Sequence, residues 1–440
     1  MQDLTFRFLI DIGIIAFFVA LFVLFVYQSI KKQRKAYVLT FGLIMGASGA
    51  LFSTFSTLIS DLGHSSTDSV LAGRFLTSMF GFIVLAGSLV MTIIIWQMKQ
   101  TKVISPELEY IAFGGILIGI GFTLFGVLVG GNTSGSFYLT VISITVYSVS
   151  FLFIYAFFEQ LEQEKPERIR MLIIACLFLA ICFTGWLTLF DLSSIPGEFG
   201  KVAIVMWDFA YDSFGVVIFI FGAYVHYKAY NYTRERNLFI LTIGATLIAI
   251  GFVIGFLNDI KSDFLFLNEI FSLLGDLGGV LGDFVKLLGM AIFFIVYILN
   301  IDYLYRIPVN IYAIMFFSSA GLSLYSAKVE SPIEIDDSFI SAVIVAISEF
   351  IKQVIGTRGT LERIITQDRT FVFSSGENIS AAIFADRSTY FLSNSLRFAT
   401  AELDKSLGEK FDPGSYDLDE IAPKVEEIFL KHFPYIKLVI

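Results

Sequence analysis

The chain has 440 residues, of which 56% are hydrophobic and only 16% are charged, and its mean hydropathy is +0.79. These values exclude an ordinary soluble globular protein. The formal net charge of −9 gives no reason to expect nucleic-acid binding. The two cysteines, Cys176 and Cys182, share one apolar run and are predicted to be small buried hydrophobic residues, not a disulfide or a metal site.

Nine apolar runs are long enough to cross a bilayer as helices. They cover about residues 6–29, 36–60, 75–96, 111–130, 137–158, 171–190, 204–226, 238–257 and 280–301. The first run lacks a small-residue cleavage site, so we expect a retained span and not a signal peptide. A shorter apolar stretch, residues 264–274, is expected to lie at the outer membrane interface. The sequence therefore predicts an all-α membrane domain over residues 1–305.

The charges between these runs predict how the chain is oriented. Thirteen basic residues fall on one side of the membrane: Lys31, Lys32, Arg34, Lys35, Lys99, Lys102, Lys165, Arg168, Arg170, Lys228, Arg234, Arg236 and Arg306. Four fall on the other side, together with the N-terminus: Arg7, Arg74, Lys201 and Lys261. By the positive-inside rule, the N-terminus is expected outside the cell membrane and the C-terminal domain in the cytoplasm.

A weak internal repeat is present in the even-numbered runs. Segments 41–49, 113–121 and 243–251 each carry two glycines seven residues apart, which places both on nearly the same helix face. The pairs are Gly42 and Gly49, Gly114 and Gly121, and Gly244 and Gly251. This pattern favours one leading helix followed by four helical hairpins, in which small residues let neighbouring helices approach closely. The alternative is that glycine is simply common in membrane helices.

Ionisable residues inside the apolar runs are the candidate functional residues, because each is costly in lipid unless it is paired or hydrated. Asp208 and Asp212 lie one turn apart on one face of the seventh run, and Asp283 and Lys286 lie at the same expected depth in the ninth. Arg74 opens the third run on the same side. An Asp212–Lys286 or an Asp208–Arg74 pair is plausible. These residues either line a cavity for a small polar ligand or ion from outside, or form a structural ion pair.

The three histidines do not suggest a metal or haem site, and no cofactor is expected. His64 is expected in an outer loop and His226 at a surface-exposed inner helix end. The third, His432, lies in the C-terminal region, which has no cysteine and no glycine-rich phosphate loop. Composition and motifs therefore predict a protein that is not an enzyme.

Residues 309–440 have the pattern of a separate α+β domain. Strands are predicted at 311–317, 322–328, 361–366, 370–374 and 379–385, with a helix at 339–354 between the second and the third. A further helix follows, and its apolar face is formed by Leu392, Leu396, Ala399, Leu403 and Leu407. A last helix holds Val425, Ile428 and Phe429, and Pro423 suits its first turn better than its interior.

This order of elements resembles the longin-like members of the longin/roadblock superfamily. The resemblance rests on segments 311–316 and 321–326, the 339–354 helix and segment 382–386. It implies a five-stranded antiparallel sheet with one helix against one face and two against the other. It also implies an interaction platform, commonly for small GTPases and for trafficking or signalling proteins. The combination with a multi-pass body is similar to archaeal membrane proteins rich in these modules.

The expected function is that of an integral-membrane receptor or scaffold whose cytosolic longin-like domain recruits a protein partner, such as a small GTPase, or self-associates. Residues 310–440 hold 12 basic and 18 acidic side chains, which favours a basic partner surface over anionic lipid head groups. The alternative is a secondary transporter or channel-like protein with a regulatory cytosolic domain.

Overall fold

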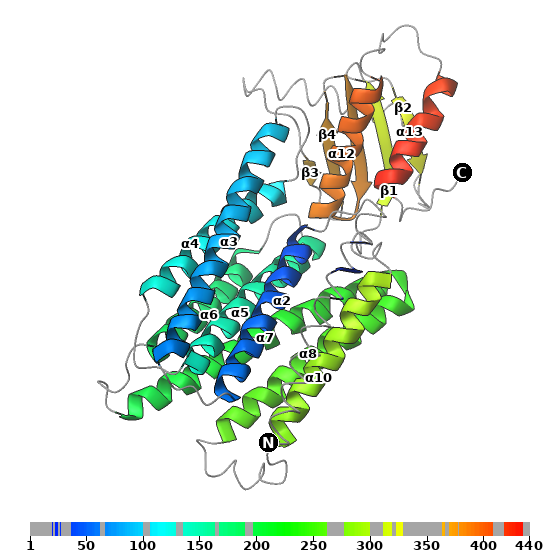
Figure 1. The fold of residues 1–440 in the computed structure, drawn as a ribbon. Coiled ribbons are helices and arrows are strands. Elements are labelled where there is room, and N and C mark those ends of the chain that lie inside the picture. Colours follow the sequence, from blue (N-terminus) through cyan, green and yellow to red (C-terminus); the bar gives the residue numbers. More distant parts are fainter. Residues whose placement is uncertain are drawn as a thin grey trace. The chain divides into compact units, whose positions relative to one another are not determined.

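A computed structural model of the protein describes residues 20, 23–24, 27, 37–61, 67–99, 106–128, 135–162, 167–189, 197–261, 277–299, 311–318, 323–328, 363–365, 369–376, 378–407 and 418–433. The chain forms two compact units (Figure 1). The first contains Met1–Phe158 and Pro166–Ile301, and the second contains Glu159–Lys165 and Asp302–Ile440.

The described part of the first unit is helical except at Glu167, Arg234 and Glu235. Its helices are α2 (Tyr37–Asp61), α3 (Thr67–Lys99), α4 (Pro106–Leu128), α5 (Gly135–Glu162), α6 (Arg168–Leu189), α7 (Gly197–Thr233), α8 (Arg236–Lys261) and α10 (Leu277–Leu299). Seven of these described helices are long and apolar enough to cross a membrane, and α4 has a shorter apolar core at Ile111–Thr123. The protein is therefore a multi-pass membrane protein.

These helices coincide with eight of the nine predicted spans. The first span, residues 6–29, lies outside the described residues except for four positions, and the 264–274 stretch lies wholly outside them. The total of nine spans stays a prediction.

Helices α2 and α5 pack through small residues spaced seven apart on both helices. Ser150 Oγ donates a hydrogen bond to the Gly42 carbonyl at 2.6 Å, and Ser143 Oγ donates one to the Gly49 carbonyl at 2.8 Å. A Cβ atom added to Gly42 would lie 3.2 Å from Cβ of Phe153. The predicted role of Gly42 and Gly49 as a packing face is confirmed, and the helix that packs against them is α5.

The antiparallel contact between α8 and α10 is closer still. A Cβ atom on Gly251 would lie 2.8 Å from the Gly282 carbonyl oxygen, and one on Gly289 would lie 2.8 Å from that of Gly244. Both helices therefore carry glycines seven residues apart, and the two pairs face each other. Backbone meets backbone here, so no side-chain movement could make room for a larger residue.

The predicted repeat is wrong in α4. A Cβ atom on Gly114 or Gly121 would meet nothing within 4 Å, whereas one on Gly119 would lie 2.7 Å from Cα of Leu85 in α3. Gly115 also faces α3, where it approaches Ser88. The helix is apolar on every side, so glycine spacing alone did not identify the side that packs.

We predict opposite effects for alanine at two helical glycines. Gly251→Ala should lower the free energy of unfolding by about 1–3 kcal/mol, because its methyl group would collide with the backbone of α10. Gly114→Ala, which adds a methyl group in open space, should be neutral or stabilising by up to about 1 kcal/mol. SDS titration of the purified protein in mixed micelles measures both values. Equal losses at the two positions would contradict the packing.

The second unit contains a five-stranded antiparallel sheet. The strands are β1 (Ile311–Ser318), β2 (Ser323–Lys328), β3 (Arg363–Ile365), β4 (Thr370–Ser375) and β5 (Ile379–Ala385), in the spatial order β2-β1-β5-β4-β3. The five predicted strands are thus confirmed. Strands β1 and β5 are buried along almost their whole length, as expected for strands covered on both faces. The predicted 339–354 helix lies outside the described residues.

Helices α12 (Tyr390–Leu407) and α13 (Leu418–His432) lie on the same face of the sheet (Figure 1). Thr389 caps α12, because its Oγ1 accepts a hydrogen bond from the Leu392 amide at 3.3 Å. Asp404 of α12 accepts hydrogen bonds from the backbone amides of Asn378 and Ile379 at 2.9 and 3.2 Å, which ties the β4–β5 turn to the helix.

The apolar faces predicted for the two helices are confirmed, since all eight named side chains are buried. They are Leu392, Leu396, Ala399, Leu403, Leu407, Val425, Ile428 and Phe429. The prediction that Pro423 stands in the first turn of the last helix is wrong. Helix α13 begins at Leu418, so Pro423 lies inside it and removes one helical hydrogen bond.

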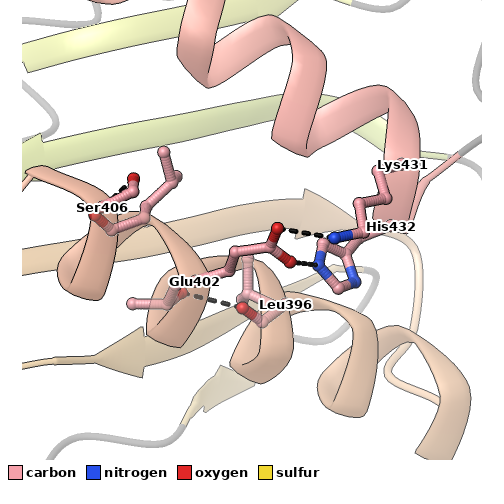
Figure 2. A network of polar contacts seen from close by, with 7 residues as sticks. Leu396, Glu402, Ser406, Lys431 and His432 are labelled. Atoms are coloured by element: carbon pink, nitrogen blue, oxygen red, sulfur yellow. Dashed lines mark hydrogen bonds and ion pairs between the residues drawn. The ribbon is translucent and has the colours of Figure 1, made fainter.

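One carboxylate joins α12 to α13 (Figure 2). Glu402 accepts hydrogen bonds from Nζ of Lys431 at 2.6 Å and from Nε2 of His432 at 2.7 Å. Partial burial alone would raise the pKa of Glu402, but the hydrogen bonds and charges of its two partners outweigh burial and hold the pKa below its ordinary value.

Glu402→Gln should loosen α13 at neutral pH and not at strongly acidic pH. Because the pKa of Glu402 is depressed by folding, its stabilising effect is present above the ordinary glutamate pKa and is lost as the pH falls through the depressed value. For a half-exposed ion pair we expect about 0.5 kcal/mol, roughly a twofold faster amide exchange in α13. Hydrogen exchange of the full chain, corrected for intrinsic rates, measures this effect. Glu427→Gln, on the exposed face of α13, is the control, and an effect independent of pH would contradict the assignment.

Candidate functional site

Three helices, α7, α8 and α10, bring the predicted charged residues together. Asp212 of α7 is only 4% exposed. A methyl group placed on Gly255 of α8 would lie 3.4 and 3.5 Å from the two carboxylate oxygens of Asp212 and 3.3 Å from Nζ of Lys286 in α10. The carboxylate and the ammonium therefore both lie within contact distance of one position beside Gly255, which brings the two opposite charges near each other.

Lys286 is also held by a second carboxylate and by an aromatic ring. Its Nζ lies 3.1 Å from Oδ1 of Asp283, one turn earlier on α10, and 4.8 Å from the centroid of the Phe252 ring. The side chain of Lys286 is 17% exposed, whereas that of Asp283 is 73% exposed. The ammonium thus has one buried and one exposed carboxylate within reach.

The Phe252 ring beside this ammonium belongs to a cluster of aromatic side chains. The Phe252 ring contacts Tyr211, Phe151 and Phe219, with centroids 5.7, 5.5 and 6.1 Å apart. Gly215 of α7 makes this contact possible, because a Cβ atom there would lie 2.7 Å from the Phe252 ring. Ring faces attract cations, so the Phe252 ring favours the positive charge of Lys286 at this position.

The other two predicted site residues are less well placed. Asp208 is half-buried one turn before Asp212 on α7. Arg74 belongs to α3, but its side chain lies outside the described residues. The Asp208–Arg74 pair stays a prediction.

The expectation that His226 lies at the surface is wrong, because its side chain is only 2% exposed. Its Nδ1 lies 2.6 Å from the Gly222 carbonyl oxygen, and its Nε2 is hydrogen-bonded to the hydroxyl of Tyr297 in α10. The rings of Phe158 and Phe293 enclose it. Its spacing from Gly215, Phe219 and Gly222, all on one face of α7, is the signal that sequence analysis missed.

Each His226 nitrogen has a defined role. Because a backbone carbonyl can only accept, Nδ1 donates to Gly222 and Nε2 accepts from Tyr297 when the ring is neutral. Helices α7 and α10 are therefore joined by a hydrogen bond between His226 and Tyr297, and their charged side chains Asp212 and Lys286 both lie beside Gly255.

The groups that lie beside Gly255 are a buried carboxylate and a partly exposed ammonium. Among the described residues, no group of three or more His, Cys, Asp or Glu side chains could hold a metal ion.

Comparison with protein-family models, with curated proteins and with solved structures finds no match to this chain. The assignment of a function therefore depends on the geometry alone.

Removal of the Lys286 ammonium should lower the stability of the protein far more than removal of its exposed partner, the Asp283 carboxylate. Lys286→Met should lower the free energy of unfolding by about 3 kcal/mol, because it leaves the buried Asp212 carboxylate without its cation. Asp283→Asn should cost less than about 1 kcal/mol, because this carboxylate is 73% exposed.

A double variant supplies the control. Asp212→Asn combined with Lys286→Met removes both charges and should recover most of the lost stability in SDS titration. Additive losses in the double variant would show that the two groups do not interact.

Proposed function

We propose that this protein is a membrane receptor or scaffold whose C-terminal domain recruits a cytosolic protein partner. The observation that carries the proposal is that α10, which holds Lys286 and Asp283, ends at Leu299, and the sheet begins at Ile311. Among the described elements, the helix that carries the charged residues is thus followed along the chain by strand β1 of the sheet.

Helix α10 is suited to carry a change from one end to the other. About 20 Å of helix separate Lys286 from Leu299. The glycine contacts with α8 resist bending, so a change in the pairing of Lys286 would rotate or shift α10 as a rigid element. Near the other end of α10, Tyr297 is hydrogen-bonded to His226 of α7, so the same shift of α10 would move this contact with α7.

The charge asymmetry supports an orientation with the N-terminus outside and the C-terminal unit in the cytoplasm. In this orientation Asp212 and Lys286 lie toward the outer side of the membrane, where a ligand would arrive. The recruiting module would be a longin-like domain that acts by binding and not by catalysis. Its antiparallel sheet, with α12 and α13 on one face, supports that assignment.

A small GTPase is the partner class that the resemblance favours, and the acidic balance of residues 310–440 favours a basic contact surface. A secondary transporter is the second candidate, and the buried carboxylate of Asp212 between packed helices is the observation that favours it.

The test uses the full chain in nanodiscs as bait for purified small GTPases loaded with GTP or GDP. We expect one nucleotide state to bind at least about fivefold more tightly than the other, the lower end of typical coupling energies. A chain ending at Ile301 is the control and should capture nothing. Failure to bind in both nucleotide states would remove the GTPase proposal, and solute uptake into proteoliposomes that Asp212→Asn abolishes would establish the transporter instead.

A further inference from the structure

The turn between α7 and α8 joins a basic surface to an exposed apolar face of the membrane unit. We propose that this surface, formed by Arg234, Arg236 and the exposed side of α8, binds an anionic phospholipid. The two guanidinium groups contact the lipid phosphate, and the acyl chains lie along α8. The proposal goes beyond the receptor function and does not depend on it.

Helix α8 has one exposed stripe that begins at its first residue. The exposed side chains are three or four positions apart, so they lie on one face of the helix. They are Arg236, Phe239, Ile243, Thr246, Ile250 and Val253. The stripe extends over about 25 Å, which exceeds the roughly 15 Å of hydrocarbon in one leaflet. A cation thus lies at the end of an apolar surface that is long enough for acyl chains.

Aromatic rings lie beside the basic end of this stripe. The exposed face of α7 carries Tyr224 and Tyr227 in its last three turns. The ring of Tyr230 lies 6.5 Å from that of Tyr227 and 5.2 Å from that of Phe239 in α8, measured between centroids. Tyrosine is enriched at the level of the lipid head groups, because its ring is apolar and its hydroxyl is polar. The head groups are therefore expected beside the α7–α8 turn.

The turn carries an excess of positive charge. Residues 228–236 include three basic side chains, Lys228, Arg234 and Arg236, and one acidic side chain, Glu235. Arg234 and Arg236 are exposed, and within the described part of the chain neither forms an ion pair. The guanidinium of Arg234 lies 5.8 Å from the centroid of the Tyr230 ring, which places this charge at the level of the aromatic rings.

The start of α6 is different, although it also carries arginines. Residues 162–170 hold three acidic and three basic side chains, so their charges balance. Arg170 pairs with Glu167 at 2.9 Å, and its guanidinium lies 4.5 Å from the centroid of the Phe221 ring. The protein itself supplies the anion at this helix end, whereas the α7–α8 turn keeps a net positive charge.

The chemistry of the turn favours an anionic phospholipid over other lipids. A guanidinium can donate two parallel hydrogen bonds to the oxygens of a phosphate group. A zwitterionic head group would bring its own cation to a turn that is already positive, whereas an anionic head group brings only negative charge. In the proposed orientation the turn lies on the cytoplasmic side, where the leaflet contains anionic lipids.

The backbone at Arg234 does not require an arginine. Its φ is 55°, in the left-handed region, and its N–H donates a hydrogen bond to the Tyr230 carbonyl at 2.7 Å, which ends α7. Glycine adopts this conformation without strain, because it has no Cβ atom. The side chain of Arg234 is therefore present at a conformational cost. Arg234→Gly removes the guanidinium and leaves the turn intact.

The test measures lipid binding to the full chain in detergent micelles by native mass spectrometry, which resolves each bound lipid. Titration with phosphatidylglycerol or phosphatidylcholine gives the association constant of the first lipid, and we expect phosphatidylglycerol to bind more tightly. Arg234→Gly and Arg236→Gln should each weaken phosphatidylglycerol binding about fivefold, the effect of one arginine at an anionic lipid surface. The double variant should bind the two lipids equally, and Arg234→Gly should unfold at no lower temperature than the natural protein.

Arg168→Gln is the matched control, because it removes an exposed arginine from the start of α6 and should leave phosphatidylglycerol binding unchanged. Inorganic phosphate at equal ionic strength is the second control and should not displace the lipid, since it cannot use the apolar stripe. Equal binding of the two lipids by the natural protein, an equal loss in Arg168→Gln, a preference retained in the double variant, or displacement by inorganic phosphate would each overturn the proposal.

Discussion

Close approach of helix backbones at small residues is the constraint on which the membrane unit depends. Lipid offers no hydrophobic drive for helix association, so close packing between helix backbones must stabilise the association. Gly42 and Gly49 pack against α5, and Gly244 and Gly251 of α8 pack against Gly289 and Gly282 of α10. The charged residues lie beside this packing, because the Asp212 carboxylate of α7 and the Lys286 ammonium of α10 are both within contact distance of the position that a Cβ atom on Gly255 would take.

The same packing explains why charges are tolerated at this position. A buried carboxylate is costly unless a cation stays near it, and the rigid α8–α10 contact keeps Lys286 at the depth of Asp212.

Much of the architecture could be predicted from the sequence because lipid thickness and strand alternation leave simple patterns. The positions of eight described helices, the five strands and the proximity of Asp212 to Lys286 follow from run length, period and expected depth. The packing face of α4 did not, because a helix that is apolar on all sides has no marked face, and Gly115 and Gly119 pack while Gly114 and Gly121 do not. The burial of His226 was missed because its partner Tyr297 lies 71 positions further along the chain.

The strand order has a consequence for synthesis of the protein. Strand β1 pairs with β5, yet residues 319–378 separate them, a length that takes roughly 3 to 12 seconds to translate. Until β5 leaves the ribosome, the apolar strand β1 has only β2 beside it, and an isolated hairpin is marginally stable. The nascent chain therefore exposes an incomplete, apolar sheet after its last described membrane helix. During that interval, strand pairing with a neighbouring nascent chain competes with folding.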